Sequence, residues 1–217
     1  MKMVEIKTDS GQIGWRFVIR WVLLTLAGWV IGFPLGFILG ELALDNAGIE
    51  ICVGAMVGLM QWFALRRVVK HSGFWILASI AGFIVSASIH AAACYYLKTS
   101  DDLGNPTGIL MWTLSFILGG TLTGLLQQRI LRHQVRRSGW WVPASAAGWG
   151  LSLIGLATAY FVLPTGRKGP APFVWLLIRN LIVPTMGTVL LGIVTGGVLI
   201  WLLRQPKQQM LDTATQK

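Results

Sequence analysis

Six long blocks of apolar residues alternate with short polar stretches along the chain. Each block has about the 20 residues that an α-helix needs to cross the hydrocarbon core of a bilayer. They cover residues 17–39, 48–69, 74–97, 108–131, 140–163 and 181–203. The pattern predicts an all-α polytopic integral membrane protein with six transmembrane helices. We expect a single membrane domain over residues 1–205, followed by a short polar C-terminal tail, 206–217.

A shorter apolar stretch precedes the sixth block. It covers residues 173–180 and ends in Arg179 and Asn180. This pattern fits a separate interfacial helix as well as an extension of the sixth span. The first block, by contrast, is too long for the apolar region of a signal peptide, so we expect it to be retained as a helix.

The blocks also form three copies of one helical hairpin, over about 16–69, 70–131 and 138–204. The segment SGFWILASIAGF begins at Ser72, its close copy SGWWVPASAAGW begins at Ser138, and a weaker copy, RWVLLTLAGW, begins at Arg20. Three columns of this alignment are Trp21, Trp75 and Trp141; Thr25, Ser79 and Ser145; and Gly28, Gly82 and Gly148. Because a fixed period signals a repeated structural unit, we predict three hairpins packed around a pseudo-threefold axis.

The second helix of each hairpin carries its own motif. A GxxxG pair is followed, at a constant distance, by Leu-Arg. The glycines are Gly54 and Gly58, Gly120 and Gly124, and Gly192 and Gly196. Gln61 and Gln127 occupy the same position in the first two copies, where the third copy has Leu199.

These motifs resemble those of a group of uncharacterised bacterial multipass membrane proteins, common in cyanobacteria. Their repeated units read G-x3-G-x2-Q-W-x2-L-R and G-W-W-x3-S-x2-G-W. The matching segments here are 54–66, with Gln61 and Trp62, 120–132, and 139–149. The third copy departs from the pattern at Leu199. The resemblance implies the membrane architecture and no particular chemistry.

Charge then indicates the orientation. Only 12% of the residues are charged, although the net charge is +10; soluble proteins average about 25% charged residues. Of the 18 Lys and Arg residues, 14 lie in the N-terminal segment, the second and fourth connections and the C-terminal tail. Because basic connections stay in the cytoplasm, we place both termini there, in a bacterial cytoplasmic membrane or, alternatively, a thylakoid membrane. Nucleic acid is not an expected partner.

Glycines at a spacing of four residues point to helix contacts. Gly28, Gly32, Gly36 and Gly40 form one stripe on the first span. Small residues let the backbones of membrane helices approach each other, so we expect this stripe and the three GxxxG pairs to be packing surfaces. A lumen lined by glycine is the alternative.

Three polar side chains within the spans are candidate binding residues. Gln61 and Gln127 each follow the second glycine of a GxxxG pair by three residues, so we expect both inside the bundle, as a pair. Ser79 and Ser145 lie at matching depth as hydrogen-bond partners. His90 is the one histidine within a predicted span, and Cys94 shares its helix face; an ionisable residue at this depth is a functional candidate.

Aromatic and basic residues near the span ends point to the lipid interface. Arg66, Arg132 and Arg204 end the second helix of each copy, where an arginine can reach a lipid phosphate. The tryptophans expected to form an interfacial belt are Trp15, Trp21, Trp75, Trp140, Trp141 and Trp201. Those expected deeper, packing the bundle or facing a flat ligand, are Trp29, Trp62, Trp112 and Trp149.

Groups for catalysis are scarce in the spans. No Asp or Glu lies in the core of a span, and the two cysteines, Cys52 and Cys94, form no CxxC motif. We therefore expect no enzymatic activity, metal or cofactor. Two functions stay open: a structural or assembly component of a membrane complex, and a small transporter or channel for an uncharged solute along the pseudo-threefold axis. The expected partners are membrane lipids, including anionic headgroups, with a protein partner or a homo-oligomer as a further alternative.

Overall fold

The computed structural model describes residues 14–39, 45–98, 106–162 and 183–205. All the regular structure in these ranges is helical, as predicted. The elements are α1 (Trp15–Leu39), α2 (Asp45–Leu65), α3 (Phe74–Leu97), α4 (Pro106–Leu131), the 3-10 helix η2 (Ser138–Trp140), α5 (Trp141–Val162) and α7 (Val183–Leu203). The stretch 173–180 and the C-terminal tail lie outside the described residues.

Five of the described helices are long and apolar enough to cross a membrane. They are α1, α3 and α4 over their full lengths, α2 from Gly48 and α7 from Thr185. The side chains of α5 are described only as far as Ile154, so a sixth span remains a prediction. The outer surface of the bundle is apolar: Leu23, Leu77 and Leu110 are more than half exposed. A surface of this kind suits lipid better than water.

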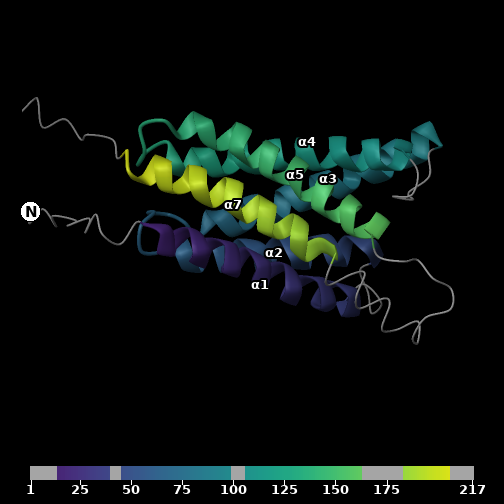
Figure 1. Ribbon diagram of the computed structural model, residues 1–217, viewed down its shortest axis with the longest axis horizontal. Coiled ribbons are helices and arrows are strands. Elements are labelled where there is room, and N and C mark those ends of the chain that lie inside the picture. The colour runs from purple at the N-terminus through teal and green to yellow at the C-terminus, as the bar shows by residue number, and fades with distance from the viewer. Residues whose placement is uncertain (1–13, 40–44, 99–105, 163–182, 206–217) are drawn as a thin grey trace, which may run out of the picture.

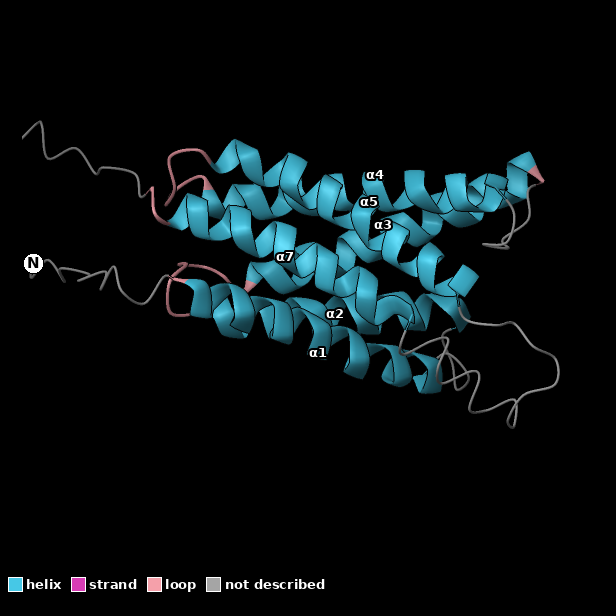
Figure 2. Ribbon diagram, viewed as in Figure 1, coloured by secondary structure: helices cyan, strands magenta, loops and turns pink. Residues whose placement is uncertain are grey.

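The helices run alternately up and down and form a closed ring. Among the described α-helices, each packs against the one before it and the one after it, and α7 returns to α1 (Figure 1). We call the end at which α1, α3 and α5 begin the basic end, because Arg66, Arg132 and Arg204 lie there. The connections 66–73 and 132–137 also lie at this end (Figure 2).

The connections at the basic end are tied to one another. The side-chain oxygen of Gln134 accepts from the backbone N–H of Lys70, and its amide nitrogen donates to the Lys70 carbonyl. Arg136 donates its backbone N–H to the carbonyl of Gln205 at 3.1 Å. Val69 and Val135, at equivalent positions of two copies, are both buried beneath these connections. The second helix of the first copy ends at Leu65 rather than at residue 69, because the chain turns back here to bury Val69.

Glycines bring the ring helices together. A Cβ atom added to Gly28, Gly32 or Gly36 would lie 2.5–2.8 Å from a Cα atom of α2, so these glycines set the distance between α1 and α2. Gly40 lies outside the described residues. The paired glycines of α2, α4 and α7 each face the first helix of another copy, namely α3, α5 and α1: Gly54 and Gly58, Gly120 and Gly124, and Gly192 and Gly196.

Candidate functional site

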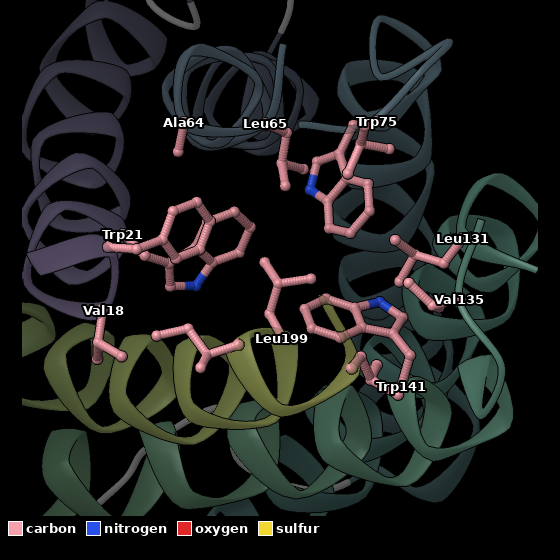
Figure 3. Close-up of a cluster of buried hydrophobic side chains, with 13 residues drawn as sticks. Val18, Trp21, Ala64, Leu65, Trp75, Leu131, Val135, Trp141 and Leu199 are labelled. Atoms are coloured by element: carbon pink, nitrogen blue, oxygen red, sulfur yellow. The ribbon is translucent and has the colours of Figure 1, made fainter. Parts of the chain in front are cut away.

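Three tryptophans meet on the axis of the bundle near its basic end (Figure 3). Trp21, Trp75 and Trp141 are each at most 1% exposed. The ring centroids of Trp21 lie 6.1 Å and 6.4 Å from those of Trp75 and Trp141, and the latter two are 5.3 Å apart. Edge-to-face and tilted contacts at this range are favourable. Together with Leu65, Leu131 and Leu199, which are also buried, this tryptophan triad fills the basic end of the axis.

The expected place of these three tryptophans in an interfacial belt is therefore wrong. Trp140, which directly precedes Trp141, and Trp15, near the start of α1, are 61% and 73% exposed and fit a belt. Each triad member precedes a buried hydroxyl residue by four positions, so the two share one helix face. In every copy of the repeat, the tryptophan stands four residues before Thr25, Ser79 or Ser145. This constant spacing is the sequence signal for the inward orientation.

Each of two triad members donates a hydrogen bond to a buried glutamine. Trp75 Nε1 donates to Gln61 Oε1, and Trp141 Nε1 donates to Gln127 Oε1, both at 2.9 Å. Gln61 and Gln127 are 6% and 2% exposed. In both cases the tryptophan begins the hairpin that follows the glutamine, so the bond joins two consecutive copies.

The same glutamines also bond within their own hairpins. Gln61 Nε2 donates to Thr25 Oγ1 at 3.2 Å, and Gln127 Nε2 donates to Ser79 Oγ at 3.3 Å. Each amide therefore bridges the two helices on either side of it. The two glutamines line one cavity, but their hydrogen bonds go to the tryptophan and hydroxyl partners rather than to each other. We call these hydrogen-bonded side chains the polar layer.

The third side of the polar layer is different. Leu199 replaces the glutamine and is fully buried, and Trp21 Nε1 donates instead to Thr195 Oγ1 at 3.0 Å. Ser145, which has no glutamine beside it, donates to the Gly120 carbonyl at 2.7 Å. The hydroxyl of Thr195 thus supplies the acceptor that the missing amide would have provided.

A second aromatic layer lies eight residues further along the same three helices. Its members are Trp29, Phe83 and Trp149. The Phe83 ring centroid lies 4.6 Å from that of Trp149 and 6.0 Å from that of Trp29. At 1.5 Å per residue, the two layers are separated by about 12 Å along the axis.

Two small cavities lie on the axis. One, of about 20 Å³, borders the polar layer and is lined by Gln61, Gln127 and Ser145, among others. The other, of about 40 Å³, is lined by Trp29, Thr188 and further residues. Phe83 and Trp149 belong to the walls of both cavities and stand between the polar groups on either side.

His90 lies apart from the glutamines. It is 5% exposed, and its ring stacks on that of Trp112 with centroids 3.7 Å apart. Its Nε2 atom lies 3.5 Å from Cys94 Sγ. His90 lines neither cavity, so the structure does not bring the three candidate binding residues into one site.

The three repeated arginines lie exposed at the basic end. The guanidinium carbon of Arg66 lies 5.6 Å and 5.0 Å from the ring centroids of Trp62 and Phe63. Arg132 Nε is 3.1 Å from His133 Nε2. All three arginine side chains therefore lie at the surface of the bundle rather than in its interior.

The described residues contain no group of three or more His, Cys, Asp or Glu side chains close enough to hold a metal ion. The two cysteines are not joined in a disulfide. The groups assembled on the axis are therefore neutral amides, hydroxyls and indoles, which can hydrogen-bond an uncharged molecule. No protein-family model, curated protein or solved structure matches the chain.

Proposed function

We propose that the chain is a non-enzymatic structural or assembly protein of a bacterial cytoplasmic membrane. The observation that carries this proposal is the filled axis. The tryptophan triad, with centroids 5.3–6.4 Å apart, occupies one level of it, and the Phe83–Trp149 pair occupies another. A bundle filled in this way presents its outer surface, rather than a lumen, to other molecules.

The proposed architecture is six spans in three hairpins around a pseudo-threefold axis. Support comes from equivalent residues that make equivalent contacts. Trp75 and Trp141 donate to Gln61 and Gln127 at the same distance. The closed ring of helices, in which α7 packs on α1, is the arrangement that three like hairpins would form.

The proposed orientation places the basic end in the cytoplasm. Arg66, Arg132 and Arg204 are exposed there, at a depth where arginine can bind lipid phosphate. Each basic residue near an anionic bilayer contributes about 1 kcal/mol of attraction. Anionic lipids are therefore the proposed partners of this end. A protein partner or a second copy would contact the apolar outer surface, and a thylakoid membrane would satisfy the same orientation rule.

A small transporter for an uncharged solute is the second candidate, in line with the two cavities on the axis. Their sizes weigh against it. A cavity needs about 10–15 Å³ to hold one water molecule, so volumes of about 40 Å³ and 20 Å³ admit a few waters. Transport would require the Phe83 and Trp149 rings to separate.

Solute flux through reconstituted protein tests the choice. Liposomes with and without the full-length protein are mixed with hyperosmotic urea or glycerol, and re-swelling is followed by light scattering; liposomes holding a known glycerol channel serve as the positive control. A structural protein leaves the re-swelling rate at that of empty liposomes. A rate that rises in proportion to the amount of protein would contradict the proposal and establish the transporter.

A further inference from the structure

The larger axial cavity is built by all six described α-helices. Its wall includes Thr25 and Trp29 of α1, Trp149 and Ser152 of α5, and Thr188 of α7. Val57, Phe83 and Phe116 complete it from α2, α3 and α4. The cavity therefore lies at the centre of the ring, on the far side of Phe83 and Trp149 from the glutamines.

One residue of this wall, Trp29, carries a polar atom that lacks a partner in the described part of the chain. Trp29 Nε1 is shielded from solvent and has no hydrogen-bond acceptor within the described part of the chain. By contrast, the three indoles of the tryptophan triad are satisfied: Trp21, Trp75 and Trp141 each donate to a side-chain oxygen. A buried N–H group is costly to leave unpaired, so the cavity beside Trp29 calls for an occupant that accepts a hydrogen bond.

The hydroxyl groups on the cavity wall indicate that the occupant should also donate hydrogen bonds. Ser152 donates its proton to the Trp149 carbonyl at 2.6 Å, and Thr25 donates to the Trp21 carbonyl at 2.8 Å. With their protons engaged, these oxygens offer lone pairs. The occupant should therefore donate hydrogen bonds as well as accept one.

The cavity volume limits the size of the occupant. About 40 Å³ corresponds to roughly three water molecules at 10–15 Å³ each, whereas a benzene-sized guest occupies an engineered cavity of about 150 Å³. Water is a small, uncharged molecule that both donates and accepts hydrogen bonds, and it fits this volume.

We propose that this cavity is an internal hydration site, holding a cluster of about three waters anchored by the Trp29 indole N–H. The cluster connects to the polar layer through Thr25, which lines the cavity and also accepts from Gln61. The rings of Phe83 and Trp149, with centroids 4.6 Å apart, separate the cluster from the smaller cavity. The proposed function does not depend on this site, because enclosed water neither requires nor prevents flux through the bundle.

Indole N–H signals provide a direct test on the intact protein. The chain has 11 tryptophans, and ¹⁵N labelling of their indoles gives one NMR signal each for the full-length protein in lipid nanodiscs. The Trp29 signal is assigned from its loss in Trp29→Phe. If that variant does not fold, it is assigned by elimination, from single Phe substitutions at the other tryptophans.

We expect the Trp29 indole proton to show a cross-peak to water in NOE and ROE spectra of the wild type. Trp75, whose N–H is bonded to Gln61 and which lines neither cavity, is the internal control and should show none. The cross-peak should persist in Ser152→Ala, which excludes relay through that hydroxyl. A Trp29 proton with no water cross-peak, or with cross-peaks only to lipid methylene protons, would overturn the proposal.

Discussion

Trp75 donates its indole N–H to the side-chain oxygen of Gln61, 2.9 Å away and 14 residues earlier in the chain. Trp141 and Gln127 repeat this bond at the same distance and the same sequence separation. The bond joins the second helix of one hairpin to the first helix of the next. Its recurrence means that the same interaction holds two of the three junctions between hairpins.

At the third junction, Thr195 replaces the glutamine as the acceptor of the indole N–H. Its equivalent on α4 is Thr123, which is buried and, like Thr195, donates to a carbonyl four residues earlier. Its equivalent on α2 is Val57, which has no hydroxyl. We therefore expect Gln61→Leu to leave the Trp75 N–H without an acceptor, whereas in Gln127→Leu the N–H of Trp141 can turn to Thr123.

The prediction is a loss of about 1–2 kcal/mol of stability for Gln61→Leu and a smaller loss for Gln127→Leu. Adding Val57→Thr to Gln61→Leu should restore part of the loss, because it copies the third junction. Unfolding in mixed detergent micelles measures these differences, with Gln128→Leu as the matched control on the next residue. Equal losses for the two glutamines, with no rescue by Val57→Thr, would contradict the proposed replacement of glutamine by a threonine hydroxyl.

The glycine contacts give a second prediction. In Gly32→Ala the new Cβ would lie 2.8 Å from the Val53 Cα atom, a backbone position that cannot move alone. We expect α1 and α2 to separate and the thermal midpoint in detergent to fall, and to fall further in Gly32→Leu. Gly197, which has nothing within 4 Å of its added Cβ, is the control. Gly197→Ala should leave the midpoint unchanged or raise it through helix propensity. If Gly32→Ala and Gly197→Ala changed the thermal midpoint by the same amount, tight packing between α1 and α2 would be contradicted.

The helices themselves could be predicted well from the sequence. The predicted span 74–97 coincides with α3, and the predicted end at residue 131 coincides with that of α4. Length and apolar content suffice here, because a membrane helix satisfies its backbone hydrogen bonds internally and needs no partner to be recognised. Which helices pack against one another is harder to predict from the sequence.

The candidate site could be predicted only in part. The inward orientation of Gln61 and Gln127 follows from the GxxxG spacing, and the apolar third side follows from Leu199. The hydrogen-bond partners of these side chains do not follow from the sequence, because they depend on how far adjacent helices are shifted along one another. Ser79 accepts from Gln127 as expected, whereas Ser145 bonds to the Gly120 carbonyl. The general preference of indoles for the interface does not predict the inward tryptophans; their alignment in the repeat, four residues before a hydroxyl residue, does.

Orientation in the membrane is a third prediction. Because basic residues gather at one end, both termini should be cytoplasmic. A fluorescent protein that matures only in the cytoplasm should be bright when fused after residue 217. An alkaline phosphatase that folds only outside should be active when inserted in the connection 98–107. The reverse pattern at both sites would overturn the orientation and, with it, the proposed lipid contact of Arg66, Arg132 and Arg204.

The closed ring is the central claim, and the contact between α1 and α7 tests it most directly. A Cβ atom at Gly192 would lie 3.4 Å from that of Val22, close to the spacing of about 3.8 Å found in disulfides. In a chain with Cys52→Ala and Cys94→Ala, Val22→Cys and Gly192→Cys should therefore cross-link on mild oxidation in lipid. Val22→Cys with Gly197→Cys is the control, because no atom lies within 4 Å of a Cβ placed on Gly197.

A protease site placed between Leu97 and Pro106 provides the readout, since cleavage leaves the two cysteines on separate fragments. We predict that the fragments of the Val22–Gly192 pair migrate together on a non-reducing gel and separate after reduction, while those of the control separate in both. Fragments of the Val22–Gly192 pair that separate without reduction, or a control that cross-links equally, would contradict a ring closed by α1 and α7.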